Sequence, residues 1–413
     1  MTASEKLEAL VASRREGWSL PGEFYRDAVV YRAEMEAIWR RQWLFVGHTC
    51  QVPRTGDYLV VPVDTDSILV IRGEDGNLRA MHNLCRHRGT LLCRDETGNA
   101  ARLVCPYHQW VYGNDGSLLN CRGMQEDLDK GELGLARVHL RTLEGMIYIC
   151  LADRPPDFER AAGAMTPVAR PQGLPRAKVA KIVDYEVEAN WKIVWENNRE
   201  CYHCNANHPQ YIRANFDHYN EDDTSEAVRA RIGAVVARGE QKWREAGLAL
   251  SHTETGMACF PDPEQDLWFA ANRTALVEGY VSESMDGQQV STLMGEYSEA
   301  EVGTLRMRTM PNMWIHCSCD HAVSTRLLPA GRASTQVRVI WLVDEGAEEG
   351  KDYRLEELMP FWQLTSEQDW EICRAVQLGV VSRGYQPGPF STYKEYNVDA
   401  FVRWYLKSLS EAS

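Results

Sequence analysis

Two short loops, each with one cysteine and one histidine, constrain this chain more than any other feature. The first is Cys85–His87, and after a gap of 17 residues the second is Cys105–His108. Zinc fingers with two cysteines and two histidines usually pair cysteine with cysteine in one loop and histidine with histidine in the other. Here each loop offers one sulfur and one nitrogen. The arrangement therefore suits a centre with two metal ions, each taking one ligand from each loop.

A Rieske [2Fe–2S] cluster has this requirement, because one of its irons takes two cysteines and the other takes two histidines. We predict that the cluster ligands are Cys85, His87, Cys105 and His108. Gly89 suits a tight loop close to such a cluster, since glycine tolerates backbone conformations that other residues avoid. On spacing alone, a zinc ribbon or cysteines and histidines packed in a core are the alternatives.

A second concentration of metal ligands lies between Asn197 and Pro209. On a helix, Asn197, Glu200 and His203 would share one face, because they are three residues apart. His208 follows five residues later and reaches that face only if the helix opens before the proline. Two neutral histidines and one distant carboxylate form the facial triad of non-haem Fe(II) oxygenases. The segment therefore predicts a mononuclear iron site.

The residues alone leave the third ligand open. Asp369 lies in a helical run and Asp320 lies near another pair of cysteines, and either could present a carboxylate inward. Cys201 and Cys204 have C-x-x-C spacing and could hold zinc together with the two histidines, or the histidines could simply be packed or solvated. Iron is favoured because a Rieske cluster transfers single electrons and does no substrate chemistry, so a second centre is expected to use them.

Composition excludes several classes of partner. The formal net charge of −14 disfavours nucleic acid and anionic membrane surfaces, and it is compatible with a cationic substrate. Residues 1–6 carry charge and lack the apolar region of a secretory signal, and no run of 18 apolar residues predicts a transmembrane helix. The chain has 12 cysteines. We interpret those outside the cluster, such as Cys150, Cys259 and Cys373, as reduced buried thiols in a cytoplasmic protein.

The hydrophobic pattern predicts an α+β chain. Residues 1–40 have helical spacing, residues 41–155 consist of short strand-like runs broken by turns, and residues 156–413 mix strands with helices. The Pro-rich run after Asp153 marks the second boundary. Within the last part we expect helices at 190–206, 220–247, 355–380 and 397–410, and strands at 181–188, 266–282, 289–297, 302–309, 313–317, 321–329 and 334–344.

From about residue 20 to its end, the chain resembles the catalytic α subunits of Rieske non-haem iron oxygenases. Within that family it is most similar to the glycine betaine and stachydrine demethylases, with the carnitine and choline monooxygenases nearby. The stretches that carry the resemblance are Asn83–Gly89, Leu103–Trp110, Asn190–Lys192, Glu196–Cys204, Met285–Gly287 and Tyr385–Pro389.

The resemblance implies an all-β Rieske [2Fe–2S] domain joined to a catalytic domain of the helix-grip type, an antiparallel sheet with helices that the N-terminal helices complete. It assigns the cluster to the four loop ligands and the mononuclear iron to His203, His208 and Asp369. Glu200 matches the carboxylate that links the cluster of one subunit to the iron of its neighbour, in a homotrimer with head-to-tail contacts. Glu200 and Asn197 are therefore the predicted catalytic residues.

The resemblance also implies an O2-dependent monooxygenase or N-demethylase. It would hydroxylate an N-methyl group of a small, betaine-like methylated ammonium compound and release formaldehyde. No G-x-G-x-x-G follows a strand, so we expect electrons from a separate flavin-containing ferredoxin-type reductase that oxidises NAD(P)H. Candidates for a cation–π cage are Tyr202, Trp268, Phe269, Tyr280 and Trp314.

Three other functions compete with this one. The same scaffold could hydroxylate an aromatic or other small organic molecule. A Rieske electron-transfer protein without an oxygenase site is a different class, and the set Glu200, His203 and His208 argues against it. A zinc-dependent binding module is the third.

Overall fold

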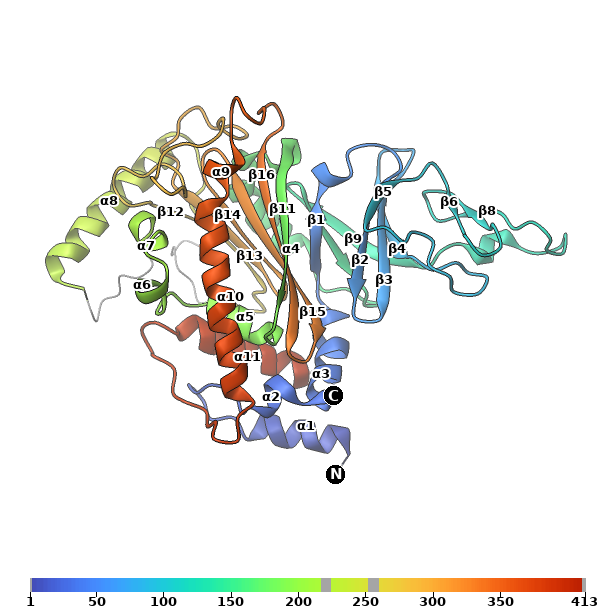
Figure 1. Cartoon of the computed structure of the whole chain (residues 1–413), viewed down its shortest axis with the longest axis horizontal. Coiled ribbons are helices and arrows are strands. Elements are labelled where there is room, and N and C mark those ends of the chain that lie inside the picture. Colours follow the sequence, from blue (N-terminus) through green and yellow to red (C-terminus); the bar gives the residue numbers. More distant parts are fainter. Residues whose placement is uncertain (1, 217–223, 252–259, 411–413) are drawn as a thin grey trace. The chain divides into compact units, whose positions relative to one another are not determined.

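The computed structural model describes residues 2–216, 224–251 and 260–410, and the chain forms two compact units (Figure 1). One unit is Arg40–Pro156. The other combines the N-terminal residues as far as Trp39 with the chain from Asp157 onward. Helices and antiparallel sheets occur together, which confirms the predicted α+β class. Among the described residues, no helix is both long and apolar enough to cross a membrane.

The unit Arg40–Pro156 is built from antiparallel strands. Its larger sheet has seven strands in the order β1-β10-β9-β4-β3-β2-β5, and a second sheet has the order β6-β7-β8. The strands are β1 (Leu44–His48), β2 (Asp57–Val63), β3 (Asp66–Arg72), β4 (Leu78–His82), β5 (Thr97–Asn99), β6 (Leu103–Val104), β7 (Val111–Tyr112), β8 (Leu118–Asn120), β9 (Arg137–Leu143) and β10 (Met146–Cys150). One Cys/His loop follows β4, and the other joins β6 to β7.

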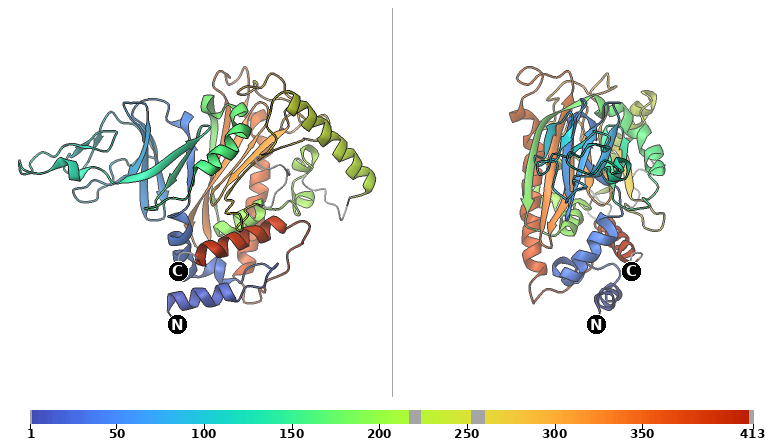
Figure 2. Two further views of the ribbon diagram at one scale, coloured as in Figure 1. Left: turned by 180° about the vertical axis from the view of Figure 1, so that it is seen from behind. Right: turned by 90° about the vertical axis from the view of Figure 1, so that its right-hand side faces the viewer.

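The second unit is organised around a six-stranded antiparallel sheet in the order β11-β16-β15-β14-β13-β12. Its strands are β11 (Ala177–Val187), β12 (Phe269–Thr274), β13 (Thr304–Thr309), β14 (Met313–Cys317), β15 (Ala322–Gly331) and β16 (Ser334–Asp344). The central strands are buried almost throughout, because helices cover the sheet. Figures 1 and 2 show α10 (Pro360–Val380) across one face and α4 (Glu159–Ala169) on the other.

The remaining helices of this unit are short or lie at the chain ends. They are α1 (Ala3–Ala12), α2 (Glu23–Arg26), α3 (Ala28–Glu34) with the π-helical turn Met35–Trp39, α5 (Trp191–Asn198), α6 (Cys204–Asn207), α7 (Tyr211–Ala214), α8 (Glu226–Glu245), α9 (Leu355–Leu358) and α11 (Tyr396–Ser410).

Two element predictions were wrong. The helix expected at 190–206 ends at Asn198, because the Glu200 carboxylate accepts the N–H groups of the following residues Tyr202 and His203, which a longer helix would bond to its own carbonyls. The strand expected at 289–297 does not form. Its backbone at Val290 and Ser291 donates to the carboxylate of Asp320 instead of to a neighbouring strand. The run 266–282 is a strand only over Phe269–Thr274.

A buried ion pair fixes the start of α5, the helix that leads into the second ligand segment. Lys192 Nζ lies 2.5 Å from Glu34 Oε1, and both side chains are fully buried. The same carboxylate accepts from the Trp191 indole at 2.9 Å and from the Tyr405 hydroxyl at 2.6 Å. Burial lowers the pKa of Lys192, and Glu34 opposes that shift. The pair therefore joins α3, α5 and α11.

Lys192→Met is expected to lower the free energy of unfolding of this unit by about 3–5 kcal/mol, because it leaves the Glu34 carboxylate charged, buried and without its cation. The double variant Glu34→Gln/Lys192→Met should recover part of the loss, since no uncompensated charge remains. Urea unfolding followed by tryptophan fluorescence measures both. Equal losses in the single and double variants would mean that packing, and not the charge, stabilises the helix.

Candidate active site

The two Cys/His loops have the same backbone design. The N–H of Cys85 donates to the carbonyl of Thr90 at 2.9 Å, and the N–H of Cys105 donates to that of Trp110 at 2.8 Å. Each loop also closes from its fifth residue back to the cysteine carbonyl, and that fifth residue has a positive φ: 75° at Gly89 and 59° at Gln109. Glycine adopts this conformation without strain. Each turn thus presents one thiol and one imidazole.

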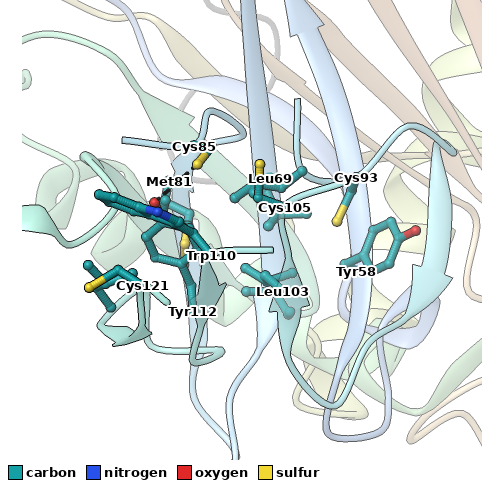
Figure 3. Close-up of a cluster of buried hydrophobic side chains, with 14 residues drawn as sticks. Tyr58, Leu69, Met81, Cys85, Cys93, Leu103, Cys105, Trp110, Tyr112 and Cys121 are labelled. Atoms are coloured by element: carbon teal, nitrogen blue, oxygen red, sulfur yellow. Dashed lines mark hydrogen bonds between the residues drawn. The ribbon is translucent and has the colours of Figure 1, made fainter. Parts of the chain in front are cut away.

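The four side chains of these loops come together. Nδ1 of His87 lies 3.2 Å from Nδ1 of His108, a separation that lets both nitrogens bind one metal ion. Figure 3 shows Cys85 and Cys105 in the core of the unit beside Tyr112, whose hydroxyl is 3.4 Å from the Cys85 sulfur. The thiols are buried and the imidazoles are partly or fully exposed. The donor set fits a Rieske cluster.

The second ligand segment, 197–209, contains the end of α5, the short helix α6 and the residues on either side of α6, and α10 lies next to it. His203 and His208 flank the short helix α6, and Asp369 lies in the middle of α10. Oδ1 of Asp369 is 3.2 Å from Nε2 of His203 and 3.0 Å from Nε2 of His208. Donors about 3 Å apart fit neighbouring corners of an octahedron whose metal–ligand bonds are about 2.1 Å. These three side chains could hold one ferrous ion.

Hydrogen bonds orient both imidazoles toward that point. Nδ1 of His203 lies 2.5 Å from Oε1 of Glu200, and Nδ1 of His208 lies 2.8 Å from Oε1 of Gln368. Each Nδ1–H can donate to its oxygen, which leaves Nε2 for a metal. Gln210 fixes the Gln368 amide in turn, with its Nε2 at 2.9 Å. Asn197 contacts an imidazole directly, because its Nδ2 lies 3.4 Å from Nε2 of His203.

The electrostatics of the three groups are strongly coupled. Burial opposes the charged form of His203, but its hydrogen bonds to Asp369 and Glu200 prevail and raise its pKa to about 10. Burial likewise opposes ionisation of Asp369, yet the two histidines hold its pKa below the usual value. Without a metal the site is thus an imidazolium held between two carboxylates.

The cysteines in this loop differ from the prediction of reduced thiols. Cys201 and Cys204 form a disulfide. Donor atoms of His203, Cys204 and His208 lie within 4.8 Å of one another, so distance alone would allow a Cys-containing metal site. A sulfur bonded to another sulfur offers no thiolate, however, whereas the Asp369 carboxylate lies 3.2 and 3.0 Å from the two Nε2 atoms. Cys259 falls outside the described residues.

Asp320, the other carboxylate that the sequence left open as a third ligand, makes its contacts away from the two histidines. It is fully buried and accepts hydrogen bonds from the Ser282 hydroxyl and from the backbone N–H groups of Val290 and Ser291. Nδ1 of His321 lies 2.8 Å from Oδ1, the oxygen that also accepts from Ser282. Its oxygens therefore organise a loop, and the geometry favours Asp369.

His203, His208 and Asp369 line a cavity of about 180 Å³. Pockets for drug-sized ligands are about 300–1,000 Å³, so this volume suits a small molecule. Of the five aromatic residues predicted as a cage, only Tyr202 lines it; Trp268, Phe269, Tyr280 and Trp314 do not. Trp314, for example, packs edge-on against Trp195. The aromatic residues that line the cavity are Tyr202, Tyr211, Phe260, Trp362, Tyr393 and Tyr396.

The sequence analysis did not identify several residues that line or support this site. Trp362 precedes Asp369 by seven residues on α10, and helical spacing could have placed the two on one face once Asp369 was chosen. Gln368 could have been found in the same way, because it immediately precedes Asp369 on α10. Nothing in the sequence singled out Gln210 or Arg306, because their roles depend on contacts across the fold.

Comparison with known proteins agrees with this geometry. Residues 42–140 match the model of the Rieske [2Fe–2S] domain, and residues 174–411 match that of the ring hydroxylating alpha subunit (catalytic domain). The chain is 38% identical over 412 residues to the glycine betaine monooxygenase oxygenase subunit of Chromohalobacter salexigens, covering 99% of this chain and 90% of the relative. The chain belongs to the ring-hydroxylating oxygenase alpha-subunit family.

Two further relatives are more distant. The carnitine monooxygenase oxygenase subunit of Acinetobacter pittii is 33% identical over 222 residues, covering 51% of this chain and 58% of the relative. A solved quaternary ammonium Rieske monooxygenase, reported for carnitine oxidation and inter-subunit electron transfer, has a TM-score of 0.71 at 21% identity, covering 97% of this chain and 98% of that one. It shows the same fold.

As an oxygenase alpha subunit, the chain is an enzyme that uses a Rieske [2Fe–2S] cluster, mononuclear iron and O2. The predicted family and cofactors are confirmed. The zinc-binding module and the Rieske carrier without an oxygenase site were wrong, because the family match includes the catalytic domain.

Loading Fe(II) into protein that retains the cluster but lacks the mononuclear metal should release about one proton per site at pH 7.5. His203 is protonated there, since its pKa is raised to about 10, and coordination requires its Nε2 to lose that proton. Apparent affinity should consequently rise with pH up to about 10. Anaerobic calorimetry in buffers with different ionisation enthalpies measures the proton count.

Glu200→Gln provides the matched control for this measurement. It removes one of the two carboxylates that favour the imidazolium, so it should release fewer protons on loading. Loading of the unmodified protein without proton release would contradict the proposed involvement of His203.

Proposed function

We propose that this enzyme is a monooxygenase that demethylates a small methylated ammonium compound. The observation that carries the proposal is the convergence of His203, His208 and Asp369 at the end of a small cavity with aromatic walls. Full-length similarity to a glycine betaine monooxygenase subunit supports the substrate class. An aromatic substrate on the same scaffold is less favoured, because charged and polar side chains occupy much of the cavity wall.

We assign the metal ligands as follows. His203, His208 and Asp369 bind the mononuclear iron, and the cluster ligands are Cys85, His87, Cys105 and His108. Bound iron supplies the activation of O2 that lets an N-methyl C–H bond be hydroxylated. The resulting hemiaminal loses formaldehyde, and the amine keeps the electron pair of the broken C–N bond.

The side chains of the protein have defined tasks in this reaction. Glu200 and Gln368 hold the Nδ1–H groups of the two histidines, so that both Nε2 atoms face the same point. Trp362 presents an aromatic wall to a methylated cation. Asn197 lines the cavity within reach of His203 and can hydrogen-bond a polar atom of the bound molecules.

We further propose that electrons arrive through a neighbouring subunit of a homotrimer. Within one chain, the cluster imidazoles are partly or fully exposed, so a partner subunit can contact them. Glu200 already contacts His203 and could accept an N–H from His108 of a neighbour, which would join the two centres through one carboxylate. A separate flavin-containing ferredoxin-type reductase would supply the electrons from NAD(P)H, in the cytoplasm.

Turnover is the direct test of the function. Purified protein with three irons per chain, supplied with a compatible reductase and NADH, should release formaldehyde from glycine betaine in proportion to O2 consumed. Choline, carnitine and a neutral N,N-dimethylurea are the comparison substrates. Oxygen uptake without formaldehyde from any methylated ammonium compound would contradict the proposed reaction.

The ligand assignment has a test of its own. Asp369→Asn should reduce mononuclear iron to a small fraction of the unmodified level, because the amide lacks the charge that the ferrous ion needs from its third ligand. Cys204→Ser is the matched control, and it should retain iron since that sulfur is bonded to Cys201. Iron quantitation and the cluster absorbance distinguish the two centres. Iron lost in Cys204→Ser but kept in Asp369→Asn would reverse the assignment.

Glu200→Gln should keep both metal centres and cut turnover about 100-fold or more, because the amide cannot bridge two imidazole N–H groups as a carboxylate does. Stopped-flow reoxidation of the reduced cluster in the presence of substrate and O2 measures the step. Unchanged reoxidation would remove Glu200 from the electron path.

A further inference from the structure

The segment that carries the two histidines also carries a second set of metal donors. Donor atoms of His203, Cys204 and His208 lie within 4.8 Å of one another. Cys201 and Cys204 form a disulfide, and both line the same cavity as the histidines. Zinc prefers nitrogen and thiolate ligands, whereas two imidazoles and a carboxylate suit ferrous iron. The oxidation state of the Cys204 sulfur therefore decides whether a zinc-type donor set exists beside the iron-type set.

Backbone hydrogen bonds hold this segment in place independently of the disulfide. The N–H of Cys204 donates to the carbonyl of Cys201 at 3.3 Å, and the N–H of His208 donates to that of Cys204 at 2.9 Å. The Glu200 carboxylate accepts the N–H of His203 at 3.3 Å. Reduction of the disulfide breaks none of these bonds. It frees the Cys204 side chain to change rotamer beside two imidazoles whose backbone is still anchored.

The two sulfurs differ in their access to solvent. Cys201 is half-buried, whereas Cys204 is only 4% exposed. An incoming thiolate therefore reaches the Cys201 sulfur more readily, and attack there expels the Cys204 sulfur as a thiolate next to the histidines. A second thiolate of the reductant then attacks the mixed disulfide and releases Cys201. One disulfide and two reductant thiols thus become two cysteine thiols and one oxidised reductant.

A peroxide can drive the reverse reaction. Hydrogen peroxide oxidises one cysteine thiol to a sulfenic acid and leaves one water, and the second thiol then displaces another water to form the disulfide. In a reducing compartment such disulfides are usually transient, and they are usually catalytic or redox-sensing. A C-x-x-C pair that lines an oxygenase cavity fits this class.

A thiolate from Cys204 would change the metal preference of the site. For a given site, affinity rises from Fe(II) to zinc, and a soft thiolate ligand adds to that preference. Zinc in closed sites takes four ligands in a tetrahedron. Cys204 would be the fourth ligand beside His203, His208 and Asp369, and a closed site of this kind leaves no position for O2. While the sulfur stays in the disulfide, the other three ligands form an open site.

We propose that the Cys201–Cys204 pair is a redox switch of metal preference. With the disulfide closed, the three proposed iron ligands form an open site that suits Fe(II). In the dithiol form, Cys204 adds a sulfur ligand and shifts the site toward zinc. The inference goes beyond the proposed demethylation and rests only on the ligand assignment made with it.

Zinc competition on the purified holoenzyme tests the switch. The protein is reduced with dithiothreitol, freed of the reductant under anaerobic conditions and incubated with Zn(II), next to protein kept oxidised. Reduction should raise the ratio of zinc to mononuclear iron about tenfold or more. Elemental analysis measures both metals, cluster absorbance verifies that the cluster remains, and alkylation with peptide mapping counts the two thiols. X-ray absorption at the zinc edge should show a sulfur neighbour at about 2.3 Å in the reduced protein alone.

Cys201→Ser and Cys204→Ser form a matched pair of variants, because both remove the disulfide and only the first leaves a thiol beside the histidines. Cys201→Ser should take up zinc with a sulfur neighbour even without reductant. Cys204→Ser should show the metal ratio of the oxidised protein in both redox states. Cys50→Ser is the control for the loss of a cysteine elsewhere, and it should respond to reduction as the unmodified protein does.

Three results would overturn the switch. They are an equal metal ratio in oxidised and reduced protein, zinc without a sulfur neighbour in Cys201→Ser, and two free thiols after peroxide treatment. Equal metal ratios in Cys201→Ser and Cys204→Ser would also overturn it, because the effect would then come from loss of the cross-link and not from the thiolate. None of these measurements needs turnover. Absence of formaldehyde would therefore reject the demethylation alone, and an unchanged metal ratio would reject the switch alone.

Discussion

One carboxylate oxygen meeting two imidazole nitrogens is the contact on which the active site depends. Oδ1 of Asp369 lies near His203 and His208, although 161 residues separate it from the latter. Such a long-range contact forms only if α10 packs on the sheet so that Asp369 lies opposite the segment after α5, and if that segment turns toward α10. The buried Lys192–Glu34 pair at the start of α5 helps to set that position. The proposed metal site therefore depends on the fold of the whole second unit.

The same contact explains why the neighbouring side chains have so little freedom. A metal ligand must offer the correct nitrogen, and each imidazole has two. Glu200 and Gln368 occupy Nδ1 of His203 and His208 and leave Nε2 pointing at Asp369. Glu200 also accepts the backbone N–H groups of Tyr202 and His203, which follow α5, so one carboxylate shapes the loop and orients a proposed ligand. A longer helix would have removed both functions.

Sequence reasoning was strongest where ligands are close in the chain and weakest where they meet across it. The spacing within Cys85–His87 and Cys105–His108 encodes two turns with the same hydrogen bonds, so their chemistry could be read locally. Residues alone could not choose between Asp369 and Asp320, because the choice depends on which carboxylate faces the histidines. The cage prediction failed for Trp268 and Trp314, since aromatic character does not reveal which side of a strand faces a cavity.

The charge of the cavity wall is a second property that the sequence could not predict, because it depends on which side chains the fold brings together. The chain carries a formal charge of −14, which is compatible with a cationic substrate, yet Arg306 and Arg308 line the cavity. Alternate positions of β13 bring these two side chains to the same face of the sheet, and net charge cannot predict such a placement. The proposed metal ligands lie on α10 and at the two ends of α6, whereas the two arginines lie on the sheet. Substitutions at these two positions therefore alter the cavity wall while the proposed iron ligands, which come from other elements, stay in place.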